Sequence, residues 1–136
     1  MKFSVAMSVY KNDNAQHFDR ALESITAFQT VKPSEIVLVV DGLVDDKLNG
    51  VIKKYEFAYP IFKVIRLDKN GGLGNALKLA VKNASYDLIA RMDSDDVSLP
   101  TRFEQQLAFF ESDSSVDIVG GDISEFIGEE DNIVAC

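Results

Sequence analysis

The sequence has little cysteine, histidine and proline and no tryptophan: one Cys, one His and three Pro stand among 136 residues. Its single cysteine, Cys136, cannot close an internal disulfide, which is typical of proteins from a reducing cytoplasm. A zinc site of the Cys/His type is excluded as well. The longest apolar run, residues 36–40, ends at Asp41 and is far too short to span a membrane. We therefore expect a cytoplasmic chain without a transmembrane segment, which is membrane-peripheral at most in a full-length protein.

Positive charge is also scarce. The chain has 14 Lys and Arg against 22 Asp and Glu, a formal net charge of -8. This balance argues against broad binding to nucleic acid or to anionic lipid, so a bound phosphate would need local help from a metal ion or a helix N-terminus. The hydrophobic share of 46% and the charged share of 26% are ordinary for one soluble domain, and we treat residues 1–136 as one unit.

Short runs rich in valine and isoleucine alternate with stretches of helical periodicity. This order predicts an α/β, Rossmann-like fold with a mostly parallel sheet and helices on both faces. We expect Phe28, Leu73, Val81 and Phe110 to lie on core-facing sides of helices. The expected strands cover residues 3–10, 35–41, 61–67, 86–92 and 116–119, and the helices fall around residues 18–28, 48–55, 72–83 and 100–110.

The last residues carry two further strand-like runs, 123–127 and 132–135, on either side of the acidic segment 128–131. The sequence stops inside the second run. A natural domain seldom ends in this way, so we expect the chain to be a fragment of a longer protein.

Polar residues follow four of the expected strands. In an open parallel sheet, ligands gather at the carboxyl ends of the strands, where loops and helix N-termini converge. The first strand ends near Ser8 and Tyr10, the second at Asp41, the third is followed by Asn70, and the fourth by residues 93–96. This edge of the sheet is where we expect a ligand.

Asp93 and Asp95 are the strongest local signal. Side chains at i and i+2 of an extended segment point to the same side, so these carboxylates could share a hard cation such as Mg²⁺ or Mn²⁺. The alternative is an acidic surface turn that caps the helix near Pro100. For Arg91 and Arg102, which flank this turn, surface ion pairing is the default interpretation.

Two further signals have a functional and a structural interpretation. A carboxylate at Asp41 could accept a hydrogen bond from a base N–H or a ribose hydroxyl, or it could simply end a strand. Tyr10 could stack on a flat base, or it could pack. The segment 71–75 fails the dinucleotide fingerprint because Leu77 stands where its third glycine belongs; its backbone N–H groups could still meet an anion.

Taken together, these segments resemble family 2 glycosyltransferases. The resemblance rests on five stretches in the same order as in the family: residues 3–10, 35–42, 70–77, 91–96 and 99–103. It implies the A-type fold of nucleotide-diphospho-sugar transferases, a divalent cation (Mn²⁺ or Mg²⁺), a nucleotide-sugar donor that is most often a UDP-sugar, and inversion at the transferred sugar. It also implies a glycan or lipid-linked glycan acceptor, as in bacterial cell-surface polysaccharide biosynthesis.

The resemblance assigns roles to individual residues. Asp41 would hold the base and Tyr10 would pack on it, while Asp93 would reach the ribose and the metal ion and Asp95 would bind the metal ion. We also place Ser8 and Asn70 in the nucleotide site.

Two departures from the family pattern stand out. The family often has a second acidic residue before the position of Asp41, where this chain has Val40. The family's general base is expected downstream of residue 136, so we expect the isolated chain to bind donor with little transfer activity.

Two other functions compete with this assignment. The first is a non-catalytic nucleotide-binding or interaction module with the same fold. The second is a receiver-type signalling domain, which would need an acidic pair after the first strand and a phosphoacceptor aspartate after the third. Here the acidic cluster follows the fourth strand, which disfavours the receiver.

Overall fold

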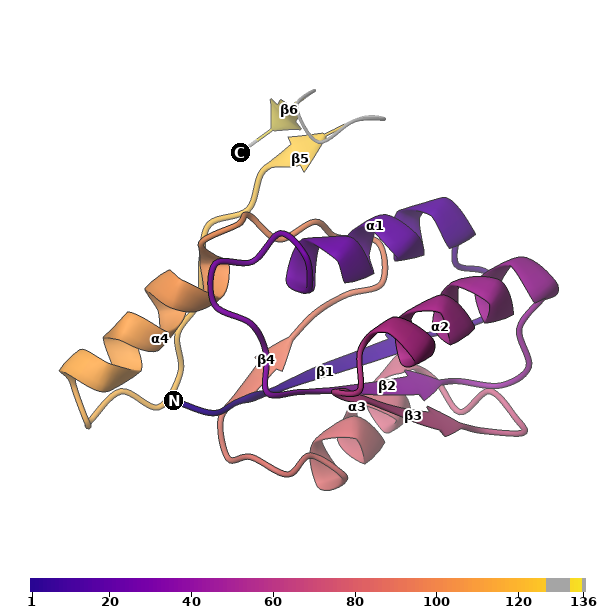
Figure 1. Ribbon diagram of the computed structural model, residues 1–136, viewed down its shortest axis with the longest axis horizontal. Coiled ribbons are helices and arrows are strands. Elements are labelled where there is room, and N and C mark those ends of the chain that lie inside the picture. Colours follow the sequence, from indigo (N-terminus) through magenta and orange to yellow (C-terminus); the bar gives the residue numbers. More distant parts are fainter. Residues whose placement is uncertain (127–132, 136) are drawn as a thin grey trace.

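A four-stranded parallel sheet forms the centre of the protein. The structure is a computed structural model that describes residues 1–126 and 133–135. The strands lie in the order β3-β2-β1-β4, and every neighbouring pair is parallel (Figure 1). The predicted α/β fold with a parallel sheet is confirmed. The strands are β1 (Ser4–Val9), β2 (Glu35–Val40), β3 (Phe62–Arg66) and β4 (Ile89–Arg91).

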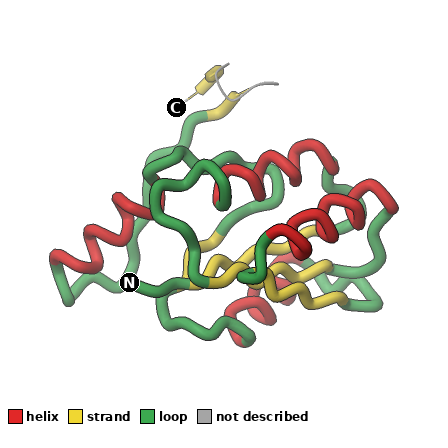
Figure 2. The backbone as a smooth tube through the Cα atoms, viewed as in Figure 1, coloured by secondary structure: helices red, strands yellow, loops and turns green. Residues whose placement is uncertain are grey.

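Helices cover both faces of this sheet, as Figure 2 shows with the strands in yellow between the red helices. Helices α1 (Ala15–Ile25) and α2 (Asp46–Ala58) lie on one face, and α3 (Leu73–Lys82) lies on the other. All six residues of β1 are buried, as expected for a strand that is covered on both sides. β2 is also covered on both sides, which explains its continuous apolar run.

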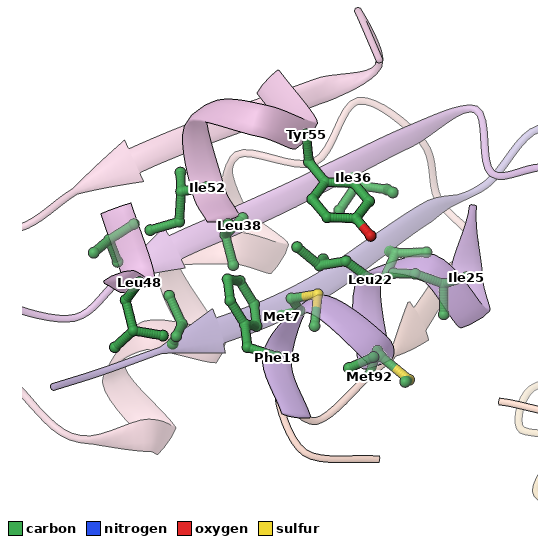
Figure 3. Close-up of a cluster of buried hydrophobic side chains, with 14 of the residues drawn as sticks. Met7, Phe18, Leu22, Ile25, Ile36, Leu38, Leu48, Ile52, Tyr55 and Met92 are labelled. Carbon is green, nitrogen blue, oxygen red and sulfur yellow. The ribbon is translucent and has the colours of Figure 1, made fainter. Parts of the chain in front are cut away.

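The larger core lies between the sheet and helices α1 and α2. Met7 and Leu38 from the sheet meet Phe18, Leu22 and residues of α2 there (Figure 3). The opposite face is thinner: Ala76 and Ala80 of α3 pack against alternate residues of β1 and β2, which are Ala6, Val37 and Val39. Small side chains on α3 allow the helix to approach the sheet closely.

The fourth helix, α4 (Arg102–Ser112), is attached at its N-terminal end. Phe103 is 2% exposed and makes an edge-to-face contact with Phe3, with ring centroids 4.9 Å apart. Further along the helix Phe110 is only half-buried, contrary to its expected place in the core. The N-terminal half of α4 is therefore attached to the core, through Phe103 and the partly buried Leu107.

The chain reverses its direction of travel across the sheet next to β1. It passes from β1 outward through β2 to β3, and it then returns to the far side of β1 to form β4. In open α/β sheets such a reversal leaves a crevice beyond the carboxyl ends of the two strands that flank it. The topology therefore places a crevice beside the ends of β1 and β4.

The predicted strand at residues 116–119 is wrong. These residues form no strand, and Ile118 is 89% exposed. A strand requires a hydrogen-bonding partner, and the described residues provide none beside this segment. β4 is also shorter than the expected 86–92, although the bonds from Ser4 N to Leu88 O and from Met92 N to Ala6 O continue its pairing on both sides.

Three side chains expected in the core are exposed. The first helix ends at Ile25, where Thr26 N donates to Glu23 O (3.2 Å), and Phe28 beyond it is 58% exposed. On α3, Leu73 is 54% and Val81 49% exposed. The alanines of α3 make its contact with the sheet, which leaves these two larger side chains at its edges.

The strand-like runs near the end of the sequence form a separate two-stranded sheet. β5 (Glu125–Phe126) pairs antiparallel with β6 (Ile133–Ala135), and this pair lies apart from the main sheet (Figure 1). The rest of the predicted strands, residues 127 and 132, the acidic segment 128–131 and Cys136 lie outside the described residues. Within the described part of the chain, no helix has the length and apolar character needed to cross a membrane.

Candidate functional site

A cleft of about 480 Å³ opens at the carboxyl ends of the strands of the main sheet. Every residue that the sequence predicts for the site lines it, although these residues come from four separate parts of the chain. Five other lining residues were not predicted as site residues, although Gly72, Leu73 and Ser94 lie in segments that the sequence analysis singled out. The complete lining is Ser8, Tyr10, Asp13, Asp41, Asn70, Gly72, Leu73, Met92, Asp93, Ser94 and Asp95.

Asp41 is bonded to the glycine-rich segment that follows β3. Its side chain belongs to a residue only 3% exposed, and its two carboxylate oxygens accept hydrogen bonds from Gly71 N (2.8 Å) and Gly72 N (3.0 Å). A carboxylate has about four lone-pair sites, so acceptor capacity remains for a ligand. In the sequence, Asp41 and the glycine segment are two separate signals, and the backbone N–H groups of that segment are expected to bind an anion. In the fold, the Asp41 carboxylate is the anion that they bind.

Gly42 brings the end of β2 against the same loop. Its φ is +92°, in the left-handed region, and a Cβ added there would lie 2.8 Å from Asn70 N. Asn70 Nδ2 in turn donates to Asp41 O (3.1 Å). Only glycine fits at this position, because both the backbone conformation and the close approach of Asn70 exclude a side chain.

Asp13 closes the turn after β1. Its Oδ2 accepts a hydrogen bond from Tyr10 N (2.9 Å), and its own N–H donates to Tyr10 O (3.0 Å). These bonds fix the backbone of Tyr10, whose side chain is 39% exposed at the cleft. The signal in the sequence was present, since Asn and Asp residues crowd positions 12–14 and such side chains bond to nearby backbone in turns.

The acidic turn, residues 93–96, lies directly after β4. Asp93 accepts a hydrogen bond from Arg91 Nε (3.3 Å) in an exposed ion pair, which is the surface ion pair expected of Arg91. Burial and the charges of Asp93 and Asp95 raise the pKa of Asp96 above its ordinary value. The N-cap of α4 is Thr101, so the turn does not cap that helix.

Arg102 was expected to form a surface ion pair, but with the described residues it forms hydrogen bonds instead. Its guanidinium donates to Arg91 O (2.8 Å) and to Ser98 Oγ (3.0 Å). Burial lowers the pKa of Arg102, and the charges of Asp96 and Asp93 partly offset this effect. The side chain is bound to the backbone and hydroxyl groups around the acidic turn.

The cleft is strongly acidic. Asp13, Asp41, Asp93 and Asp95 line it, whereas no Lys, Arg or His is present among its described lining residues. An anionic ligand would be repelled here unless a cation accompanied it. No group of three or more His, Cys, Asp or Glu side chains that could hold a metal ion is found among the described residues. A cation bound in the cleft would then take part of its ligands from elsewhere.

The family model described as "Glycosyl transferase family 2" matches residues 4–134, nearly the whole chain. This chain belongs to glycosyl transferase family 2. The predicted family is thus confirmed.

The receiver domain is excluded independently by the order of the strands. β3 pairs with β2 here, whereas receiver-type sheets place β3 beside β1.

Relatives in sequence are also glycosyltransferases. The chain is 44% identical over 135 residues to an uncharacterized glycosyltransferase of Haemophilus influenzae, covering 99% of this chain and 50% of the relative. It is 38% identical over 125 residues to the UDP-Gal:alpha-D-GlcNAc-diphosphoundecaprenol beta-1,3-galactosyltransferase of Escherichia coli, covering 92% of this chain and 45% of that enzyme. The chain spans about half the length of these curated relatives.

The fold is similar to that of a solved member of the family. Staphylococcus aureus TarS 1–349, crystallised in complex with UDP-GlcNAc, superimposes with a TM-score of 0.72 at 28% identity. The similarity covers 93% of this chain and 38% of the TarS chain. The expected A-type glycosyltransferase architecture is confirmed by this likeness together with the parallel sheet.

Proposed function

We propose that residues 1–136 form the donor-binding part of an inverting glycosyltransferase that moves a sugar from a UDP-sugar to a hydroxyl group of a glycan or lipid-linked glycan. The observation that carries this proposal is the acidic cleft, where Asp41 and the acidic turn meet at the ends of the strands. Family membership, the UDP-GlcNAc bound to TarS and the lipid-linked acceptor in the name of the Escherichia coli relative support the donor and acceptor classes.

In this proposal the nucleotide lies across the ends of β1 and β2. Asp41 accepts a hydrogen bond from an N–H group of the base with the lone pairs that its two amide bonds leave free. Tyr10, exposed at the cleft and fixed through Asp13, packs on the base. Ser8 and Asn70 line the space between base and ribose, and Asp93 reaches the ribose.

A divalent cation, Mn²⁺ or Mg²⁺, fits the donor set of the cleft. Such an ion binds through one or two carboxylates and completes its shell with water and substrate phosphates. Asp95 and Asp93 are the two carboxylates that would hold it, which agrees with the lack of a larger ligand group among the described residues. When bound, the ion would neutralise the diphosphate and stabilise its charge as it leaves.

The proposed transfer is a single in-line displacement. The acceptor hydroxyl loses its proton to a general base and attacks the anomeric carbon while the bond from that carbon to the diphosphate breaks, which inverts the configuration. The residues of this chain bind and orient the donor for that step. We assign the general base to a part of the whole protein that follows residue 136, so the chain alone should bind donor and transfer little sugar. We place the whole protein in the cytoplasm or at its membrane surface.

Calorimetric titration with UDP tests this function. Binding should be detected in Mn²⁺, and it should weaken both when the metal is removed and in Asp95→Ala. Asp87→Ala is a matched control, because Asp87 is exposed at the opposite end of the sheet, ahead of β4. Absence of UDP binding by the folded chain, or binding in which Asp95→Ala and Asp87→Ala behave alike, would contradict the proposal and favour a module that has lost this chemistry.

A further inference from the structure

The guanidinium of Arg102 joins the two ends of the acidic turn. Its Nη2 donates to Arg91 O (2.8 Å), ahead of the turn, and its Nη1 donates to Ser98 Oγ (3.0 Å), after the turn. The planar guanidinium presents its N–H groups in fixed directions, so one side chain holds both acceptors at a fixed separation. Both ends of the acidic turn are therefore bonded to the same side chain, that of Arg102.

Arg102 is itself held by residues anchored in the core. Its Nε donates to Gln106 Oε1 (3.2 Å), and the next residue, Phe103, is buried. Gln29, which is 2% exposed, accepts a hydrogen bond from Phe103 N (3.2 Å) and donates to Leu99 O (2.6 Å). The first turn of α4 has little freedom as a result, and the guanidinium extends from a fixed point.

The far end of the acidic turn has a second attachment. Ser98 N donates to Ser24 Oγ (3.0 Å) at the end of α1, and Ser98 Oγ contacts Met92 Sδ (3.3 Å). Both serines are buried. In the described part of the chain no buried side-chain nitrogen or oxygen lacks a hydrogen-bond partner, so this network is complete. A complete buried network is a rigid support.

The stability of α4 does not explain an arginine at this position. Arg102 is the first residue of the helix, where the macrodipole favours a negative charge. Burial also disfavours the charged guanidinium. Both effects oppose an arginine here, and they are offset by the bonds to Arg91 and Ser98 together with the negative charges of Asp96 and Asp93.

We propose that Arg102 is a positioning residue for the donor site. By holding Arg91 O and Ser98 Oγ together, it sets the positions of the Asp93 and Asp95 carboxylates, and it acts through the backbone of the turn without contacting donor or cation. This inference rests on the proposed function, in which these two carboxylates hold the divalent cation and the nucleotide.

The test is the coupling between Mn²⁺ and UDP, measured as the ratio of the UDP dissociation constants without and with Mn²⁺. Arg102→Gln should lower this ratio by about tenfold or more, the range found when supports of metal ligands are removed. The affinity for UDP without metal should change much less, because Asp41 and Tyr10 are untouched and only the ribose contact of Asp93 is affected. A residue needed only for stability would lower the melting temperature and leave the ratio unchanged.

Arg102→Lys tests whether the coupling depends on the geometry of the guanidinium or only on its positive charge. A lysine keeps the positive charge but cannot hold two acceptors in the fork geometry of arginine, so the coupling should fall as in Arg102→Gln. Arg66→Gln is the matched control: Arg66 is exposed on β3, bonds Asn49 and Glu56, and should leave the ratio unchanged. Full coupling in Arg102→Lys, or in both Arg102 variants, overturns the inference.

Ser98→Ala gives a second route if the Arg102 variants do not fold. It removes one acceptor of the guanidinium, and the coupling should decrease in the same direction; unchanged coupling overturns the inference. The outcome for the unsubstituted protein separates the two proposals. If Mn²⁺ has no effect on UDP binding there, the proposed function fails and this inference fails with it. If Mn²⁺ tightens binding equally in every variant, only the role of Arg102 is refuted.

Discussion

The carboxylate of Asp41 accepts a hydrogen bond from Gly71 N at 2.8 Å, although 30 residues separate the two in the sequence. A second bond, from Gly72 N, fixes the other carboxylate oxygen. The same side chain therefore holds the loop after β3 in place and lies on the surface of the cleft. Substitutions of Asp41 should affect both the stability of the fold and the binding of a nucleotide.

Asp41→Asn should lower the free energy of unfolding by about 1–3 kcal/mol, because the amide nitrogen would face a backbone N–H and leave it without an acceptor. UDP binding should weaken as well. Urea denaturation and calorimetry measure the two effects, with Asp87→Asn as the exposed control. A variant as stable as the unsubstituted protein would show that the two backbone bonds contribute nothing.

Gly42→Ala and Gly50→Ala should change stability in opposite directions. At Gly42 the positive φ and the 2.8 Å approach to Asn70 N predict a loss of about 1–3 kcal/mol. Gly50 lies inside α2 with open space around it, and alanine there should add about 0.5–1 kcal/mol. Urea denaturation compares them, and equal effects of the two substitutions would refute the account of Gly42.

Much of the site is predictable because the strand ends are local signals. Tyr10, Asp41, Asn70 and Asp93 were selected because each follows an apolar run, and a parallel sheet brings such positions to one edge. The bond between Asp41 and the glycine loop could not be predicted in the same way. It depends on how two strands and their loops are placed in space, which no periodicity in the sequence records.

The wrong predictions, the strand at 116–119 and the helix that extends to Phe28, also arise because contacts in space are not recorded in local sequence. Residues 116–119 have the composition of a strand, but they lack a neighbouring strand in the described part of the chain. The helical pattern that runs on to Phe28 is interrupted after Ile25, where Lys32 Nζ donates to the carbonyl oxygens of Thr26 and Ala27 (2.9 Å each). Local composition predicts which conformation a segment prefers, and tertiary contacts decide where it stops.

Tyr10 should contribute to binding through its ring. Tyr10→Ala should weaken UDP binding on the order of tenfold, since stacking of a base on an aromatic side chain contributes this much in nucleic-acid complexes. Tyr10→Phe keeps the ring and should bind nearly as well as the unsubstituted protein. Calorimetry in Mn²⁺ compares the three proteins. Equal affinities for the alanine and tyrosine forms would exclude stacking at this position.

Glu35 should make stability depend on pH. Burial raises its pKa, but hydrogen bonds from Ser85 N, Ser85 Oγ and Ser4 Oγ outweigh this effect and hold the pKa below its ordinary value of 4.5. A carboxyl group with a lowered pKa stabilises the folded state above its ordinary pKa, and this stabilisation is lost as the pH falls through the folded-state value.

Glu35→Gln should therefore cost about 1 kcal/mol of stability at pH 7, and the difference should shrink as the pH falls below 4.5. Urea denaturation at several pH values measures it, with Glu111→Gln, an exposed position on α4, as the control. A difference that is constant between pH 7 and pH 3 would contradict the role of the ionised carboxylate.

The most direct test of the donor site is a crystal structure of the protein with UDP and Mn²⁺, with anomalous scattering data that locate manganese. We expect a manganese peak beside Asp95 and Asp93, the base against Asp41 and Tyr10, and the diphosphate in contact with the ion. A manganese peak or a nucleotide at any other place on the protein would contradict it.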